Sequence, residues 1–308
     1  MINDKPATPI AEPAPLNEVL ADITALKDGP YASQGKLDAY LAPAAAIPAV
    51  LHEIGRLREE AFRAIGEGSG KALDLDRFDE SYLHLFLWDR EAQQVAGGYR
   101  LGRTDHLLAN FGPSGLYTST LYKFEQPFID HLNPGLELGR SFVARSYQKS
   151  IHPLGLLWRG IGRFVARYPR YAKLFGPVSI SDDYTRISKD MIVRFMRKNQ
   201  ANQAIARWIK PLNPYDELPA DDDVSQLLSS IEQVSARISE TEPDGKGVPV
   251  LLRQYLKLNA TLLEFNVDPD FAGCLDALVL VDLRDAPAAA VKRYMGAEGY
   301  AAFKAERV

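Results

Sequence analysis

The chain has 308 residues, of which 46% are hydrophobic and 25% are charged, which is the composition of a globular enzyme with a substantial core. Its single cysteine, Cys274, excludes an internal disulfide framework and favours a reducing compartment. No stretch reaches the ~18 consecutive apolar residues of a transmembrane helix, and residues 1–15 lack the apolar core of a signal peptide. We therefore expect a cytoplasmic protein.

Positive charge is concentrated in one part of the sequence, although the net charge is only -4. Between Arg140 and Lys210 there are 15 Lys and Arg residues against three acidic residues. Such a block suits an acidic partner, such as an anionic carrier protein, a phosphate-bearing cofactor or anionic lipid at the inner face of the membrane. The alternative is a solvated helix surface without a partner.

The first half of the chain predicts one long helix among several strands. Residues 1–33 are rich in Pro and Ala and indicate a flexible arm with a short helix at 16–26. Apolar residues recur at helical spacing between Ile47 and Ile65, and Gly66 provides a stop. Strands are predicted at 35–42, 82–88, 95–101, 116–124 and 136–143, of which the second and third form a hairpin.

The second half alternates helices and strands. Pro153 opens a helix that runs to about Tyr168. Further helices are predicted at 187–210, 224–238, 249–258 and from 287, and strands at 174–181, 261–267 and 275–283. This order predicts an α+β fold with a mixed, mostly antiparallel sheet flanked by helices. We place the domain at 34–285, with a helical insertion at about 186–247 and a C-terminal helix at 286–308.

The segment from Leu136 to Val143 carries the most informative chemistry. Its alternation predicts a strand with Arg140 and Phe142 on one face and Glu137 on the other. Burying an acid and an arginine on a strand is costly unless these groups have a function. Glu137 and Arg140 are therefore candidates for functional residues.

Three other patterns carry less information. The segment Gly66–Lys71 has the wrong glycine spacing for a phosphate loop and follows a predicted helix, so we interpret it as a flexible connection. His84 and Asp89 match a spacing used by glycerolipid acyltransferases, but residues five apart on a strand point to opposite faces. The five histidines and the single cysteine show no metal-ligand spacing, so we expect no metal.

Two predicted helices in the basic block form a candidate surface for an acidic partner. Arginines recur at spacings of four, four and three on the first helix, and basic residues follow along the second. Aromatic residues are sparse between them and no nucleic-acid-binding motif occurs, so we expect no nucleic acid. The predicted surface for a carrier protein or a membrane consists of Arg159, Arg163, Arg167, Arg170, Arg194, Arg197 and Lys198.

Four short motifs occur in a specific order, namely Arg58-x-x-x-Phe62, Asp76-x-x-Asp79, Gly97-x-x-Arg100-Leu101 and Glu137-Leu-x-Arg140. The pattern continues through residues 153–161, 174–181 and 248–258 to Asp268 and Asp276. This set resembles the acyl-homoserine-lactone synthases. It is more similar to the ornithine N-alpha-acyltransferases and long-chain N-acyl amino acid synthases, a group labelled haemolysin-like. The resemblance covers residues 35–285 and implies the fold of the GCN5-related N-acyltransferases.

The resemblance implies transfer of a long acyl chain from a thioester to the amine of a small amino acid such as ornithine or glycine. A 3-hydroxylated chain is one candidate. The implied donor is an acyl carrier protein with its phosphopantetheine thioester, or acyl-coenzyme A, and no cofactor is expected to bind tightly. Residues 145–154 replace the pyrophosphate-binding loop of typical acetyltransferases, which favours the carrier protein.

The resemblance also implies roles for individual residues. We predict that Glu137, Arg140 and Ser141 are catalytic. An amine attacks a carbonyl carbon only when it is neutral, so Glu137 is our candidate for the carboxylate that accepts its proton. A backbone N–H near Phe142 or Val143 is expected to hold the oxyanion. The three motif arginines are expected to form a charged network with the two motif aspartates. The predicted substrate-binding residues are Arg58, Phe62, Asp76, Asp79, Arg100, Phe142, Val143, Ser179, Arg253 and Tyr255.

Three alternatives remain open at the level of sequence. One is a homoserine-lactone-type signal synthase that uses S-adenosylmethionine, against which the longer C-terminal half argues. The second is a lysophospholipid acyltransferase, which only the spacing of His84 favours. The third is a non-catalytic, membrane-associated haemolysin-like protein, and the presence of Glu137 and Arg140 weighs against it.

Overall fold

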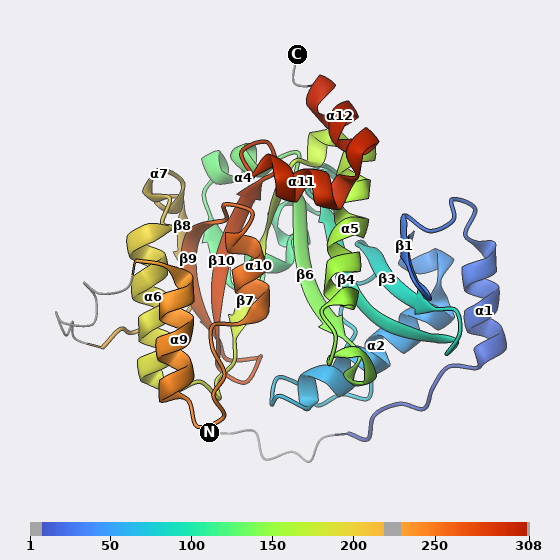
Figure 1. Ribbon diagram of the computed structural model, residues 1–308, viewed down its shortest axis with the longest axis horizontal. Helices are drawn as coiled ribbons and strands as arrows, with labels where there is room; N and C mark the ends of the chain where they lie inside the picture. Colours follow the sequence, from blue (N-terminus) through green and yellow to red (C-terminus); the bar gives the residue numbers. More distant parts are fainter. Residues whose placement is uncertain (1–7, 219–228, 307–308) are drawn as a thin grey trace.

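The structure is a computed structural model that describes residues 8–218 and 229–306 (Figure 1). An eight-stranded sheet runs through it, and neighbouring strands are antiparallel except for one parallel pair, β6 and β7. The predicted α+β fold with a mostly antiparallel sheet is therefore confirmed. In spatial order the strands are β1 (Ala32–Gln34), β2 (Leu37–Pro43), β3 (Leu83–Asp89), β4 (Gln94–Arg103), β6 (Leu136–Val143), β7 (Lys173–Ile180), β10 (Cys274–Asp282) and β9 (Thr261–Asp268). A separate short ladder pairs β5 (Tyr122–Phe124) with β8 (Ile209–Pro211).

Helices cover both faces of the sheet. Their bounds are α1 (Leu16–Ala25), α2 (Pro48–Arg63), α3 (Thr104–Phe111), α4 (Gln126–Leu132), α5 (His152–Arg167), α6 (Arg186–Asn199), α7 (Gln203–Ala206), α9 (Ile231–Thr241), α10 (Val250–Leu256), α11 (Ala288–Met295) and α12 (Ala297–Ala305). Among the helices described, none is long and apolar enough to cross a membrane.

Alternate strand positions build a separate core on each face, as the period of a strand requires. One core joins the sheet to α5, α6, α9, α10 and α11. On the opposite face α1 and α2 pack against β3, β4 and β6, while α3 and α4 pack against β7, β9 and β10. In Figure 1, α6 and α9 lie at one end of the molecule and α1 lies at the other.

Strands β6 and β7 separate soon after they meet. Their parallel pairing joins Leu136 to Leu174 and Glu137 to Phe175 and ends there, although both strands continue. Gly176 allows the close approach, because a Cβ at this position would overlap the Leu138 carbonyl oxygen. Beyond this point β6 follows β4 and β7 follows β10, so the two strands diverge.

Three predicted elements differ from the structure. Residues 116–121 are not a strand, because two 3-10 turns, Gly112–Gly115 and Tyr117–Thr120, precede the short β5, and Gly and Pro at the first turn favour a bend. The helix predicted at 187–210 ends at Asn199 and is followed by α7 and β8, so the insertion is not purely helical. Of the helix predicted at 224–238, the part before residue 229 lies outside the described residues.

The two ends of the chain also differ from expectation. From residue 8 on, the predicted flexible arm packs against α2, because the Asp22 carboxylate accepts the N–H groups of Ala49 and Val50 at 2.7 and 3.0 Å and Val19 is buried. The predicted C-terminal helix is two helices, α11 and α12. Gly296, with φ of 80°, ends the first of them, and a left-handed glycine at this place is a common stop.

Candidate active site

Arg140 lies in a bulge of β6. Two residues of this strand, Arg140 and Ser141, stand opposite a single residue of β4, Tyr99. Arg140 has φ of 50°, in the left-handed region. The bulge shifts the alternation, so that Arg140 and Glu137 both contact Tyr117 on the same face. The prediction that they lie on opposite faces is wrong, because a bulge leaves no trace in the alternation of a sequence.

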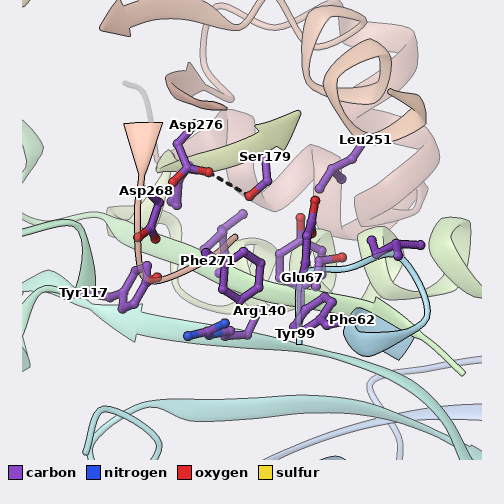
Figure 2. Close-up of a pocket in the computed structure, with 15 residues that line it drawn as sticks. Phe62, Glu67, Tyr99, Tyr117, Arg140, Ser179, Leu251, Asp268, Phe271 and Asp276 are labelled. Carbon is purple, nitrogen blue, oxygen red and sulfur yellow. Dashed lines mark hydrogen bonds between the residues drawn. The ribbon is translucent and has the colours of Figure 1, made fainter. Parts of the chain in front are cut away.

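A cavity of about 190 Å³ lies where β6 and β7 diverge (Figure 2). Its apolar lining consists of Phe62, Ile65, Leu138, Pro177, Leu251 and Phe271. Its polar lining consists of Glu67, Tyr99, Tyr117, Arg140, Ser141, Ser179, Asp268 and Asp276. Four of the predicted site residues, Phe62, Arg140, Ser141 and Ser179, therefore meet in one cavity.

The predicted network of arginines and carboxylates forms beside this cavity. Arg58 pairs with Asp74 at 2.7 Å and with Asp79 at 3.0 Å. Arg100 pairs with Asp76 at 2.6 Å and with Asp79 at 3.3 Å. Both arginines are 1% exposed and neither lines the cavity, so this part of the network holds α2 and the following loop against the sheet. The sequence analysis missed Asp74.

Arg140 brings the charge of this network into the cavity. Its guanidinium lies over the rings of Tyr117 and Phe271, 5.3 and 4.8 Å from their centres, and 3.7 Å from a carboxylate oxygen of both Asp74 and Asp76. Burial opposes the charge, but the carboxylates prevail and raise the pKa of Arg140. Its buried Nε has no hydrogen-bond partner among the described residues. The guanidinium is therefore charged and has a donor left for an anionic ligand group.

Glu137, our predicted proton acceptor, is not among the residues that line the cavity. Its buried carboxylate accepts the Tyr82 hydroxyl, the Tyr117 N–H at 3.0 Å and the Thr118 N–H at 2.7 Å. Burial raises its pKa. Because these donors occupy both oxygens and fix the 3-10 turn against β6, the contacts of Glu137 are structural. The candidate proton acceptor must then be sought among the acids that do line the cavity.

Three carboxylates line the cavity, those of Glu67, Asp268 and Asp276. Asp276 on β10 accepts the hydroxyl of Ser179 on β7 at 2.7 Å (Figure 2). Burial raises the pKa of both Asp276 and Glu67 to about 7, and it also raises that of Asp268. Glu67 was not among the predicted site residues, because it lies in the connection whose glycine content indicated only flexibility. Asp276 had a visible signal, since it interrupts an otherwise apolar strand.

Four other predicted site residues do not line the cavity. Phe142 packs in the core beside α2, and Val143 is the last residue of β6. Tyr255 is buried behind the cavity, with its hydroxyl 3.2 Å from that of Tyr99. Arg253 lies on α10, two residues from a lining leucine. An oxyanion donor near Phe142 or Val143 stays a prediction.

The predicted basic surface is not one continuous patch. Helix α5 contacts β1 to β4, whereas α6 contacts β9 at the far end of the molecule (Figure 1). Many of these side chains also have internal partners. Arg167 lies 3.6 Å from Asp28, and Arg197 pairs with Glu217 and Glu264. The side chains of Arg159, Arg170 and Arg194 contact the Gln34 side chain, Asp105 and the Leu218 carbonyl oxygen, respectively.

The histidine and aspartate that match the acyltransferase spacing lie near opposite ends of β3. His84 Nε2 is 2.8 Å from the Asp79 carbonyl oxygen, while Asp89 pairs with Lys36 at 3.0 Å. The prediction that Asp89 does not orient His84 is confirmed. Within residues 8–218 and 229–306, no group of three or more His, Cys, Asp or Glu side chains is arranged to hold a metal.

Part of the sequence matches a known protein family. Residues 57–158 match the family described as acetyltransferase (GNAT) domain. A glycine N(alpha)-acyltransferase of Bacteroides thetaiotaomicron is 34% identical over 233 residues, which span 71% of this chain and 68% of the relative. The enzyme of the same name from Phocaeicola vulgatus is 33% identical over 234 residues, which span 71% of each chain.

Among solved structures, the chain is similar to the CoA-dependent acyl-homoserine lactone synthase BjaI with SAM and isopentyl-CoA. The identity is 14% and the TM-score is 0.40, over 85% of this chain and 89% of that one. A second CoA-dependent synthase, MesI, matches with 14% identity and a TM-score of 0.39, over 84% of this chain and 95% of that one.

Proposed function

Because the chain belongs to the family of the glycine N(alpha)-acyltransferases, within the GCN5-related N-acyltransferase superfamily, it is an acyltransferase, and we propose that it transfers a long-chain fatty acyl group from a phosphopantetheine thioester to the amine of a small amino acid. One observation carries the proposal, namely the cavity at the divergence of β6 and β7. Beyond their last pair the two strands offer backbone groups that can bond the amides of a pantetheine arm. The apolar wall of Phe62, Ile65 and Leu251 suits the acyl chain.

Arg140 supports an amino acid, rather than a simple amine, as the acceptor. A guanidinium with an unpartnered donor at the cavity wall is suited to a carboxylate. We propose glycine first, because both relatives are named for it and the cavity is small. Ornithine is the second candidate, because Glu67, Asp268 and Asp276 supply negative charge for a side-chain ammonium group.

We propose an acyl carrier protein as the donor, with acyl-coenzyme A as the alternative. The segment between β6 and α5 carries exposed Arg145 and Lys149 beside Ile151, which is 62% exposed. A basic surface with an exposed apolar side chain complements an acidic carrier. This segment follows directly from the strand that lines the cavity, so a carrier bound there is placed to extend its arm between β6 and β7.

The test combines each donor with each acceptor. Purified protein is incubated with long-chain acyl carrier protein or acyl-coenzyme A, saturated or 3-hydroxylated, and with one acceptor at a time: glycine, ornithine, a lysophospholipid or S-adenosylmethionine. We expect thiol release and N-acylglycine by mass spectrometry, with the carrier protein as the better donor. Products on a lysophospholipid or on S-adenosylmethionine would support the alternative enzymes. Absence of thiol release with every pair would contradict the proposal.

A pair of charge reversals tests the donor surface separately. Arg145→Glu with Lys149→Glu should raise KM for the acyl carrier protein and leave KM for acyl-coenzyme A unchanged, since only the carrier offers an extended acidic surface. Arg237→Glu on α9 is the matched control, because this arginine is also exposed and lies on another helix. Equal KM values in all three proteins would remove this segment from donor binding.

A further inference from the structure

Asp276 lies at the polar end of the cavity with one carboxylate oxygen uncommitted. It is 2% exposed and stands directly across from Ser179 in the β7–β10 register. The Ser179 hydroxyl donates to Oδ1 at 2.7 Å, and the Cys274 thiol lies 3.8 Å from the same oxygen. No donor among the described residues bonds Oδ2. Because Asp276 lines the cavity, this oxygen is available to a ligand.

The other two acids of the cavity are engaged in local structure. Asp268 Oδ1 accepts the Asp270 N–H at 2.9 Å, and the turn after β9 bonds back to the Asp268 carbonyl oxygen. Glu67 belongs to the loop after α2 rather than to a strand; burial raises its pKa, and the nearby Ser181 hydroxyl opposes that rise. Asp276 lies within β10, where Ser179 of the neighbouring strand holds one of its oxygens, whereas Asp268 is the last residue of β9 and caps the turn that follows it.

The cavity also offers a second, opposite charge. Figure 2 shows Arg140 and Asp276 on opposite sides of it, with Phe271 between them. The two charges match the two ends of an α-amino acid, whose carboxylate would lie at Arg140 and whose ammonium group would lie at Asp276. The unpartnered Nε of Arg140 is an observation independent of the acids, and it points to the same ligand.

We propose that Asp276 is the catalytic proton acceptor of the acyl transfer, an inference that rests on the proposed function. Asp276 takes one proton from the ammonium group of the acceptor, and the neutral nitrogen attacks the thioester carbonyl carbon, forming the C–N bond. As the tetrahedral intermediate collapses, the C–S bond breaks and a second nitrogen proton leaves with the sulfur. The products are an amide and a thiol, and Asp276 releases its proton to water.

The surroundings of Asp276 favour a proton acceptor that works near neutral pH. Burial and the like charges of Asp268 and Glu67 raise the pKa of Asp276 to about 7, although the hydrogen bond from Ser179 opposes this rise. A carboxylate with this pKa holds a proton more strongly than an ordinary one and still ionises at physiological pH. The other titratable or charged groups that face it are Cys274 on its own strand, Tyr122 on β5, Tyr117 on the 3-10 turn and Arg140 on β6.

The experiment compares Asp276→Asn with wild type and with Asp130→Asn, which alters an exposed aspartate on α4. In Asp276→Asn we expect kcat with glycine to fall by at least about 100-fold, while KM for the thioester changes by less than about threefold. Aminooxyacetate carries an NH₂ group that is already neutral at pH 7 and needs no proton acceptor before it attacks. The loss of kcat in Asp276→Asn should therefore be at least about tenfold smaller with aminooxyacetate than with glycine.

Ser179→Ala supplies a second readout if Asp276→Asn folds poorly. Removing the Ser179 hydroxyl destabilises the ionised form of Asp276 and raises its pKa. In a plot of kcat against pH, the acid limb should therefore move to higher pH. A merely structural serine would leave the limb in place.

An Asp276→Asn enzyme with wild-type kcat and an unmoved acid limb in Ser179→Ala would overturn the inference while leaving the proposed function intact. A wild-type protein that releases no thiol with any acceptor would overturn both. The two failures are therefore distinguishable.

Discussion

The guanidinium of Arg58 spans both carboxylate oxygens of Asp79, with Nη1 donating to Oδ1 at 3.1 Å and Nη2 donating to Oδ2 at 3.0 Å. Both side chains are buried, and the pair fastens α2 to the loop that leads into β3. Arg100 lies 3.3 Å from the same carboxylate. Asp79 thus shares in the neutralisation of two buried cations, together with Asp74 and Asp76.

Asp79→Asn should lower the free energy of unfolding by about 3–5 kcal/mol, because Arg58 and Arg100 each lose one of their two carboxylate partners and the buried network is left with an uncompensated positive charge. Urea unfolding followed by circular dichroism measures the change. Glu240→Gln is the control, since its pair with Arg237 is exposed and worth at most about 1 kcal/mol. Equal stability of Asp79→Asn and wild type would show that the pair contributes nothing net.

The same carboxylate makes stability depend on acid pH. Burial alone would raise the pKa of Asp79, but the guanidinium groups of Arg58 and Arg100 prevail and hold it far below its usual range. With a lowered pKa, the unfolded chain takes up the proton first as the pH falls. The contribution of Asp79 is therefore present above its ordinary pKa of about 4 and is lost at lower pH. Urea unfolding from pH 6 to pH 2.5 should show a steeper loss in wild type than in Asp79→Asn.

Several parts of the fold follow from local pattern. The helical spacing from Ile47 to Ile65 gives α2 within two residues, and the alternation before and after Asp89 gives the β3–β4 hairpin. The strand predicted at 116–124 is wrong for residues 116–121, which form turns after Gly112–Gly115. Tertiary contacts stabilise these turns, because the N–H groups of Tyr117 and Thr118 bond the Glu137 carboxylate on a distant strand.

The site was less predictable than the fold. The motif arginines and aspartates do meet, Arg58 at Asp79 and Arg140 at Asp76, because the ordered motifs mark α2, its following loop and β6. The cavity acids come from the loop after α2 and from β9 and β10, and only the strand order brings these segments together. The bulge at Arg140 is likewise a property of strand register, which a single sequence does not display.

Glu137→Gln should destabilise the protein more than it impairs the chemical step. An amide NH₂ would replace one oxygen that now accepts N–H or O–H donors, and leaving a buried donor unpaired costs about 1–3 kcal/mol. We expect unfolding at lower urea and a kcat within about fivefold of wild type, because the carboxylate lies off the cavity. Unchanged stability with a kcat loss of about 100-fold would restore Glu137 as the proton acceptor.

Gly176→Ala tests the divergence of β6 and β7. A methyl group at this position would overlap the Leu138 carbonyl oxygen, so the strands must shift, at a cost of about 1–3 kcal/mol. KM for the thioester should rise as well, because the opening between the strands changes shape. Gly155→Ala on α5 is the control, since its Cβ would meet no atom within 4 Å and alanine should stabilise a helix by about 0.5–1 kcal/mol. If both variants behave alike, the close approach at Gly176 has no role.

Arg140→Gln should weaken the binding of the acceptor's carboxylate. A hydrogen bond to a charged group is worth about 1.5–3 kcal/mol, so KM for glycine should rise by about 10- to 150-fold while KM for the thioester stays near its wild-type value. Arg140→Lys keeps the charge but not the planar fork, so its effect should be intermediate. Glycinamide, which lacks the carboxylate, distinguishes loss of carboxylate binding from a general disturbance of the site. If Arg140 binds the carboxylate, the ratio of kcat/KM for glycine to that for glycinamide should fall strongly in Arg140→Gln. An unchanged ratio would place the carboxylate elsewhere in the cavity.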